Sequence, residues 1–197
     1  MKSEGAIPPE VLLRKLELLH GAAQSMTGLL NNLMDLTALQ DGRLLLHTEE
    51  IDLSVVAHQV AERYAEPAAK VGSEVRVHAP APVAGRWDRS RMEQVVTNLL
   101  GNALKYASGA PVEISVLPWQ RNSAQLVVRD YGPGIPPEHQ ARIFQRFERG
   151  ADTRPAGLGL GLWIVQGILE AAGGTISVQS ELLAGSAFTV LLPRQVP

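Results

Sequence analysis

The chain has 197 residues, of which 45% are apolar and 5% aromatic, so it can bury an aliphatic core in one sizeable domain. Its 18 basic and 20 acidic residues give a formal net charge of −2, which does not favour nucleic acid or an anionic membrane as a partner. The absence of cysteine excludes a disulfide framework, a thiolate nucleophile and a cysteine-based zinc site.

No apolar run in the sequence approaches the roughly 20 residues that a helix needs to span a bilayer. The N-terminal stretch MKSEGAIPPE lacks the apolar core of a signal peptide. We therefore expect a chain without a membrane segment and with a cytoplasmic location, whether or not a longer parent protein is anchored to a membrane.

The first predicted element is a long helix from Glu10 to about Leu39, which ends before Asp41-Gly42. Apolar residues recur along it at alternating spacings of four and three, which is typical of a helix that packs along another helix. This heptad stripe consists of Leu12, Leu16, Leu19, Ala23, Met26, Leu30, Leu33 and Thr37. The helix could lie on its own domain, but the length of the stripe favours a partner helix, in cis or from a second copy.

After Gly42 the pattern changes to strands that alternate with helices. In chain order we predict an amphipathic stretch near Leu53–Val71, a strand at Glu74–His78, a helix at Arg89–Tyr106, strands near Val112–Leu117 and Gln125–Arg129, a helix near Leu160–Ala172, and strands near Thr175–Gln179 and Ala187–Leu192. Several strands follow one another without an intervening helix. The pattern therefore predicts the α/β class, as a two-layer α/β sandwich with a mixed sheet and helices on one face.

The helix predicted at Arg89–Tyr106 carries three polar residues on one face. Asn98, Asn102 and Lys105 stand at i, i+4 and i+7. Asparagine is a poor residue in the middle of a helix, because its side chain competes for backbone hydrogen bonds. An amide oxygen is a hard ligand that suits Mg²⁺, and a lysine can meet a phosphate. Taken alone, however, the same spacing also describes a solvated helix face.

A turn with the sequence DYGPG, here called the aspartate turn (residues 130–134), follows an apolar strand. It can be a simple tight turn that Asp130 caps. Alternatively, Asp130 is a carboxylate at a strand end that accepts the exocyclic amine of adenine, while Gly132 and Gly134 let the base approach the backbone. The residues of this turn alone leave both interpretations open.

Three alternate glycines, here called the glycine turn (residues 157–161), run directly into an apolar helix. Backbone amides at such a helix start favour an anion such as phosphate. The spacing fits neither the dinucleotide fingerprint nor the P-loop, so both of those nucleotide folds are excluded. Between the two turns lies the phenylalanine segment (residues 144–149), whose surroundings are rich in charge, glycine and proline, as in a lid over a ligand.

In this order, the four elements resemble the N, G1, F and G2 boxes of sensor histidine kinases, which share an ATPase superfamily with gyrase, Hsp90 and MutL. The segment TALQDGRLLLHTEEIDL also resembles the end of that family's dimerisation hairpin and its junction with the ATP-binding domain. The resemblance implies a Bergerat-type ATP-binding fold over residues 47–197. Residues 1–46 would then be part of a dimerisation and phosphotransfer hairpin that lacks the phosphoacceptor helix.

The resemblance also implies roles around Mg-ATP. Asn102, together with Asn98, would hold Mg²⁺, and Asp130 would accept the adenine amine. The remaining nucleotide contacts that it implies are Lys105, Tyr106, Gly132, Gly134, Arg149, Gly157, Gly159, Leu160 and Gly161. The expected activity is transfer of the γ-phosphoryl group of ATP to a histidine of a two-component sensor kinase.

Asn98 stands where gyrase-like relatives place a glutamate base. An amide cannot take a proton from an attacking water, so we expect slow hydrolysis. Glu93 lies five residues away on the helix and points off the face that carries Asn98 and Asn102. Phosphoryl transfer needs mainly positioning and charge neutralisation, which suits an imidazole as the acceptor.

The sequence departs from the family pattern at the phosphoacceptor, which is a histidine followed by an acidic residue and, a few positions on, a proline. None of the five histidines fits this pattern: His20, His47, His58, His78 and His139. The chain is therefore expected to be a fragment of a longer kinase or a natural protein that acts in trans. Its expected partners are ATP, a phosphoacceptor histidine segment in cis or in trans, a response regulator, and a second copy joined through the helix in the full-length protein.

Two other functions remain open from the sequence. Leu158 stands where the family usually has Ser or Thr, and together with the missing acceptor this motivates a pseudokinase that docks a partner through its helix. The other alternative is a serine kinase of the anti-sigma-factor type, which shares the ATP site but normally lacks a long N-terminal heptad helix.

Overall fold

The structure is a computed structural model that describes residues 9–41, 44–148 and 158–195. The chain divides into two compact units, Met1–Arg43 and Leu44–Pro197. The first contains helix α1 (Pro9–Gln40), whose ends agree with the predicted helix to within a residue. Apolar side chains of the heptad stripe are exposed along it, among them Leu12, Leu16, Leu19, Met26, Leu30 and Leu33. Among the described residues, no helix has the length and hydropathy to cross a membrane.

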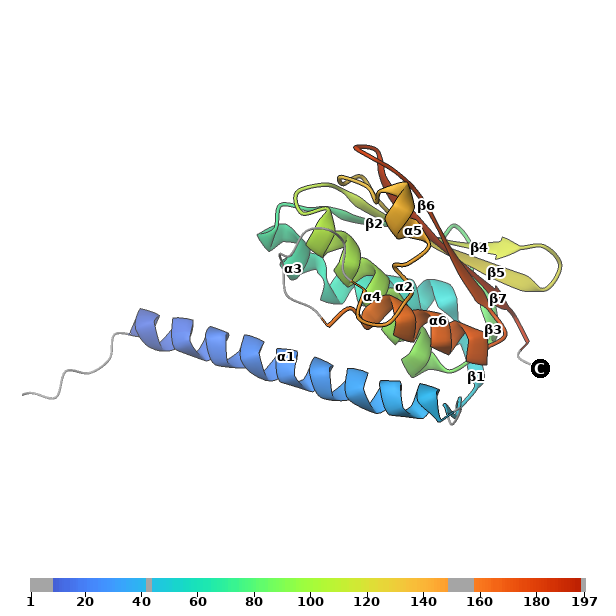
Figure 1. The fold of residues 1–197 in the computed structure, drawn as a ribbon, viewed down its shortest axis with the longest axis horizontal. Helices are drawn as coiled ribbons and strands as arrows, with labels where there is room; N and C mark the ends of the chain where they lie inside the picture. Colours follow the sequence, from blue (N-terminus) through green and yellow to red (C-terminus); the bar gives the residue numbers. More distant parts are fainter. Residues whose placement is uncertain (1–8, 42–43, 149–157, 196–197) are drawn as a thin grey trace, which may run out of the picture. The chain divides into compact units, whose positions relative to one another are not determined.

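The second unit is built on a five-stranded mixed sheet with the strand order β2-β4-β5-β7-β6. Its strands are β2 (Val75–His78), β4 (Val112–Trp119), β5 (Ser123–Asp130), β6 (Thr175–Glu181) and β7 (Gly185–Pro193). Only the β2–β4 pair is parallel among these described strands. Helices α2 (Leu53–Arg63), α4 (Arg89–Tyr106) and α6 (Gly161–Ala171) form a layer on one face of the sheet (Figure 1). This confirms the predicted two-layer α/β sandwich.

The core lies between the sheet and this helix layer. Strands β4, β5 and β7 alternate buried and less buried residues, as expected of strands with one covered face. The buried strand residues include Val112, Ile114, Val116, Ala124, Leu126, Val128, Phe188, Val190 and Leu192. The helices contribute Val56, Val60, Met92, Val96, Leu99, Ile164 and Ile168. Burial of these aliphatic side chains holds the two layers together, at roughly 25 cal/mol per Å² of apolar surface.

The start of α4 is fixed by Asp88, a buried residue directly before the helix. Its carboxylate accepts hydrogen bonds from the Arg91 amide (3.1 Å), the Ser90 hydroxyl (2.7 Å) and the His47 amide (2.9 Å). Burial works against the charge, but these hydrogen bonds hold the pKa of Asp88 below its usual range. An N-cap of this kind stabilises the helix that carries the polar face predicted from the sequence.

The structure differs from the sequence prediction at three short places. The amphipathic stretch near Leu53–Val71 forms two helices, α2 and α3 (Ala65–Lys70), rather than one. They part at Tyr64, because in a continuous helix the ring of Pro67 would clash with the carbonyl of Arg63. The antiparallel pair β1 (Glu49–Asp52) and β3 (Ala84–Trp87) and the helix α5 (Pro137–Gln140) were not predicted. Neither β1 (EEID) nor β3 (AGRW) alternates apolar and polar residues as the equally short β2 (VRVH) does, and α5 is a single helical turn.

Candidate functional site

The polar face of α4 is rotated away from its buried stripe. Met92, Val96 and Leu99 are fully buried in the core, whereas Asn98, Asn102 and Lys105 are half-buried. The Lys105 ammonium lies 4.7 Å from the centroid of the Tyr106 ring, and Tyr106 is exposed. The last turn of α4 therefore presents a cation on an aromatic face beside two amide side chains.

Asn98 connects this face to the start of α6. A Cβ atom on Gly161 would lie 3.8 Å from Asn98 Oδ1, so the amide and the glycine turn are neighbours. Asn98 Nδ2 is buried and has no hydrogen-bond partner. A half-turn of the amide exchanges its nitrogen and oxygen, so this position can present either a donor or a metal-ligating oxygen. A buried polar atom left without a partner costs about 1–3 kcal/mol, which is typical of a place where a ligand completes the hydrogen bonding.

Asp130 closes β5 as a buried carboxylate, with 7% of its surface exposed. It accepts a hydrogen bond from the Gly132 amide at 3.0 Å and another from the backbone amide of Ser186 on β7. Burial raises the pKa of Asp130 above its usual range, and the two backbone hydrogen bonds offset this only in part. The geometry leaves a carboxylate at the end of the central strand β5 that would gain from a further hydrogen-bond donor.

The aspartate turn is held between α4 and the β6–β7 turn at distances that only glycine allows. A Cβ on Gly132 would lie 2.4 Å from the Cβ of Ala107, the residue after α4. Gly134 has a φ of +74°, and a Cβ there would lie 2.1 Å from the carbonyl oxygen of Glu181. Gly132 therefore brings Asp130 close to the end of α4, where Lys105 and Tyr106 lie.

The described part of the glycine turn lies against the phenylalanine segment. Phe147 donates its amide to the carbonyl of Gly159 at 3.0 Å, and Gly159 has a φ of +67°. A Cβ on Gly159 would lie 2.5 Å from the carbonyl oxygen of Glu148. Leu160 is buried and its carbonyl accepts the Ile164 amide, which starts α6, whereas Leu158 is 42% exposed. The described part of the turn is thus anchored against the phenylalanine segment.

Three close approaches link parts of the predicted site that the structure describes, and no direct contact joins Asp130 to Asn98 among them. Asn98 lies near Gly161, Gly132 against the end of α4, and Gly159 against the phenylalanine segment. Arg149 and Gly157 lie outside the described residues. Glu93 accepts two hydrogen bonds from the Arg63 guanidinium at 3.1 Å, so its carboxylate is directed to α2.

Sequence patterns missed two residues that shape this site, Ser186 and Ala107. Ser186 reaches Asp130 only because β5 and β7 pair in the register that sets these two residues opposite each other. Ala107 matters because it is small enough for the turn to approach. A small residue directly after the polar helix is a signal for Ala107, but Ser186 has none in the local sequence.

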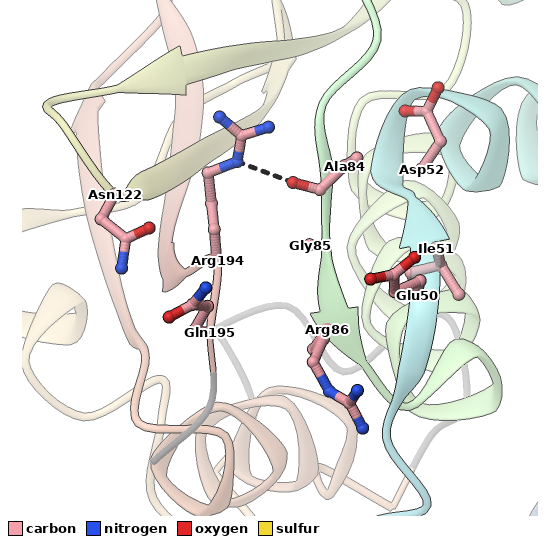
Figure 2. Close-up of a pocket in the computed structure, with 9 residues that line it drawn as sticks. All are labelled: Glu50, Ile51, Asp52, Ala84, Gly85, Arg86, Asn122, Arg194 and Gln195. Carbon is pink, nitrogen blue, oxygen red and sulfur yellow. Dashed lines mark hydrogen bonds between the residues drawn. The ribbon is translucent and has the colours of Figure 1, made fainter.

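A separate pocket of about 550 Å³ lies at the other end of β5, where Asn122 precedes the strand. It is lined by residues of β1 and β3 and of the segment after β7, and Figure 2 shows the guanidinium groups of Arg86 and Arg194 pointing away from each other. Arg194 Nε donates to the Ala84 carbonyl at 2.6 Å, and Asp52 accepts the amides of Ser54 and Val83. The polar groups that line this pocket do not converge on one point.

Comparison with known proteins places this geometry in a family. Residues 87–196 match the family described as histidine kinase-, DNA gyrase B- and HSP90-like ATPase. The sensor protein KdpD of Escherichia coli (strain K12) is 37% identical over 172 residues, which cover 86% of this chain and 19% of KdpD.

Two solved structures are also similar to this chain. The mycobacterial sensor histidine kinase MprB has 30% identity and a TM-score of 0.66, with 76% of this chain and 99% of that chain covered. Full-length ShkA in complex with AMPPNP has 28% identity and a TM-score of 0.80, with 93% and 39% covered.

The chain spans 12%, 19% and 32% of the length of three curated relatives, which are named as a hybrid signal transduction histidine kinase and two sensor proteins. The matched region begins at the last residue of β3 and includes α4, the aspartate turn and α6, which are the elements that meet at the site. The chain therefore belongs to the histidine kinase-, DNA gyrase B- and HSP90-like ATPase family and carries a nucleotide-binding domain of the sensor histidine kinase type.

Proposed function

We propose that residues 47–197 bind Mg-ATP and transfer its γ-phosphoryl group to a histidine of a two-component sensor kinase. Residues 1–46 are then the second part of a dimerisation hairpin, with the phosphoacceptor on another segment. The observation that carries the proposal is that Gly161, at the start of α6, lies beside the Asn98 amide of α4, while Gly132, which is hydrogen-bonded to Asp130, lies against Ala107 at the end of the same helix.

The adenine end of the site is assigned to the aspartate turn. Asp130 is already held by two backbone amides, so its carboxylate is oriented before a ligand arrives. The exocyclic amine of adenine would supply the further donor that this buried group can accept, and a hydrogen bond to a charged group is among the stronger ones. Gly132 and Gly134 let the turn pack against Ala107 and Glu181, and in this way they shape the adenine end of the site.

The phosphate end is assigned to α4 and the start of α6. The donor set fits magnesium, because Asn98 and Asn102 offer amide oxygens. The buried Asn98 Nδ2, which has no partner, is a donor that a phosphate oxygen could accept. When bound, Mg²⁺ supplies neutralisation of the phosphate charge. Lys105 adds a positive charge, and the amides of residues 159–161 add donors at a helix start.

The same residues favour phosphoryl transfer over hydrolysis. Asn98 has no basic group that could take a proton from water, and Glu93 is held by Arg63 of α2. A positioned imidazole, in contrast, needs no base on this chain, because its unprotonated nitrogen is the nucleophile. We expect a histidine acceptor and, downstream of it, a response regulator, with homodimerisation of the parent protein through the exposed stripe of α1.

The direct test supplies the missing acceptor in trans. The chain is mixed with Mg²⁺, γ-labelled ATP and a separately produced sensor-kinase domain that carries a histidine followed by an acidic residue. We expect label on the added domain, lost on acid treatment, because phosphohistidine is acid-labile. The control variant Asn102→Ala should abolish the labelling.

Other outcomes would replace the proposal. Label that survives acid would indicate serine phosphorylation. Nucleotide binding without transfer to acceptor domains from several sensor kinases would indicate a pseudokinase. No binding of a non-hydrolysable ATP analogue would reject the function altogether.

A further inference from the structure

The phenylalanine segment and the first turn of α6 are joined by a contact that the proposed function does not yet use. The guanidinium carbon of Arg146 lies 5.1 Å from the centroid of the Trp163 ring, within the range of a cation–π interaction. Trp163 is the third residue of α6 and is half-buried, whereas Arg146 is exposed. The contact therefore spans two segments that flank the glycine turn.

A second contact joins the same segments at the turn itself. The Phe147 amide donates to the Gly159 carbonyl, and a Cβ on Gly159 would lie 2.8 Å from the carbonyl carbon of Phe147. Both residues have left-handed backbone, with φ of +62° for Phe147 and +67° for Gly159. For Phe147 this conformation is unfavourable and persists only where the surrounding contacts hold it.

Arg146 directly precedes this strained residue, and Trp163 follows Gly159 by four positions. The two contacts thus hold the glycine turn at two places. The cation–π contact holds α6, the helix that follows the turn, and the Phe147–Gly159 hydrogen bond holds the backbone of the turn itself. Without Arg146, Phe147 can relax towards an ordinary backbone conformation and release Gly159. The amides of residues 159–161 would then lose their fixed direction.

We propose that Arg146 is a positioning residue, which acts through Trp163 to hold the backbone amides of the glycine turn in the direction that phosphate groups require. This inference rests on the proposed function, because it assumes that the turn receives the phosphates of ATP. It assigns Arg146 no contact with the nucleotide. In the described part of the chain, Asp130 is held by the amides of Gly132 and Ser186, which belong to neither segment, so loss of Arg146 is expected to leave the adenine end unchanged.

The consequence is a selective loss of affinity. Ligands that carry phosphates should bind less tightly once Arg146 is removed, whereas adenosine, which reaches only the Asp130 end, should bind unchanged. An exposed cation–π contact corresponds to a factor of about two to five in an equilibrium constant. A merely structural role would instead weaken both ligands together, because the whole fold would suffer.

The experiment is calorimetry on the full chain with AMPPNP and with adenosine, for Arg146→Ala, Trp163→Leu and the double variant. We expect Arg146→Ala to weaken AMPPNP by about two- to five-fold and to leave adenosine unchanged. The double variant should bind AMPPNP as Trp163→Leu does, because Arg146 acts only through that ring. Arg146→Lys keeps a cation and should restore part of the affinity. Arg76→Ala, an exposed arginine on β2 with its own ion pair, is the matched control and should change neither affinity.

The fluorescence of Trp163 reports on the same contact. The emission of Trp163, taken as the difference between the chain and Trp163→Phe, should shift in Arg146→Ala and not in Arg76→Ala. Trp163→Phe also keeps an aromatic face, so it serves in the affinity series if Trp163→Leu does not fold.

Three results would overturn the inference: an unchanged AMPPNP affinity in Arg146→Ala, an equal loss for AMPPNP and adenosine, or additive losses in the double variant. Additive losses would mean that Arg146 touches the phosphates directly. If the unmodified chain binds neither AMPPNP nor adenosine, the proposed function itself fails, and this inference with it.

Discussion

Both ends of β5 carry polar groups, and the two ends differ in whether the hydrogen-bonding capacity of those groups is satisfied within the fold. At the Asn122 end, the pocket of Figure 2 has volume, but the Arg194 guanidinium and the Asp52 carboxylate already have partners within the fold. At the Asp130 end, a buried carboxylate lies at one side of a site where Asn98 Nδ2 lacks a partner altogether. Unmet hydrogen bonding, rather than empty volume, distinguishes the candidate site.

The glycines near the two ends of β5 also differ in what they make room for. A Cβ on Gly85 would meet the ring of Trp87 at 2.4 Å, so this glycine makes room for a core side chain. The glycine at 132 makes room for the end of α4, and therefore brings one functional element to another. Close approach serves packing at one end of the strand and assembly of a site at the other.

The largest effect expected is the loss of nucleotide affinity in Asp130→Asn. The amide keeps an acceptor for the Gly132 and Ser186 amides but loses the charge that would bind the adenine amine. We expect AMPPNP affinity to fall by about ten- to a hundredfold, the range for a hydrogen bond to a charged group. Titration calorimetry measures it. The counterpart at the other end, Asp52→Asn, should bind AMPPNP as the unmodified chain does; equal losses in the two variants would erase the distinction between the ends.

Gly132→Ala should lower both stability and affinity. Its Cβ would be forced against Ala107, and such overpacking typically costs about 1–3 kcal/mol of unfolding free energy. Gly85→Ala should lose stability through its clash with Trp87 but keep its affinity for AMPPNP. Urea denaturation and calorimetry on both variants separate these effects. A Gly132→Ala chain with normal affinity would show that the aspartate turn does not shape the nucleotide pocket.

The pH dependence of stability should have opposite signs for two aspartates. Because burial raises the pKa of Asp130, the folded chain binds its proton more tightly than the unfolded chain does. Its contribution to the free energy of unfolding therefore falls as pH rises from the unfolded pKa through the folded one. The pKa of Asp88 is lowered in the fold, so its contribution is present above the unfolded pKa and lost as pH falls through the folded one.

Urea denaturation at a series of pH values, compared with Asp130→Asn and Asp88→Asn, isolates each group. At neutral pH, Asp130→Asn should be at least as stable as the unmodified chain, and Asp88→Asn should be less stable. Nucleotide affinity should rise with pH through the window in which Asp130 ionises. An Asp130→Asn chain that is destabilised at neutral pH would contradict the assigned sign.

The smallest effect is expected for Arg194→Ala. This side chain donates one hydrogen bond to the Ala84 carbonyl at the rim of the Figure 2 pocket. Its loss should lower the free energy of unfolding by about 0.5–1.5 kcal/mol and leave nucleotide affinity unchanged. Thermal denaturation and calorimetry measure both. A clear loss of AMPPNP affinity would mean that the two ends of β5 are coupled.

Local sequence determined the long elements and supplied most of the residues of the proposed site. The α4 helix was predicted at both ends, because the apolar stripe from Met92 to Ala103 is regular over several turns. The polar residues Asn98, Asn102 and Lys105 were assigned to one face by spacing alone. The glycines at 132 and 134 could be recognised because they stand in an Asp-x-Gly-x-Gly pattern directly after an apolar strand.

Tertiary structure decided which of these residues meet. The contact of Asn98 with the start of α6, the hydrogen bond from Ser186 to Asp130 and the Arg146–Trp163 contact all join residues that are distant in sequence. Such contacts depend on strand register and helix packing, which are set by the whole core and leave no periodic trace in a local segment. For the same reason the four-residue strands β1 and β3 appeared only in the fold, where their pairing with each other gives them their structure.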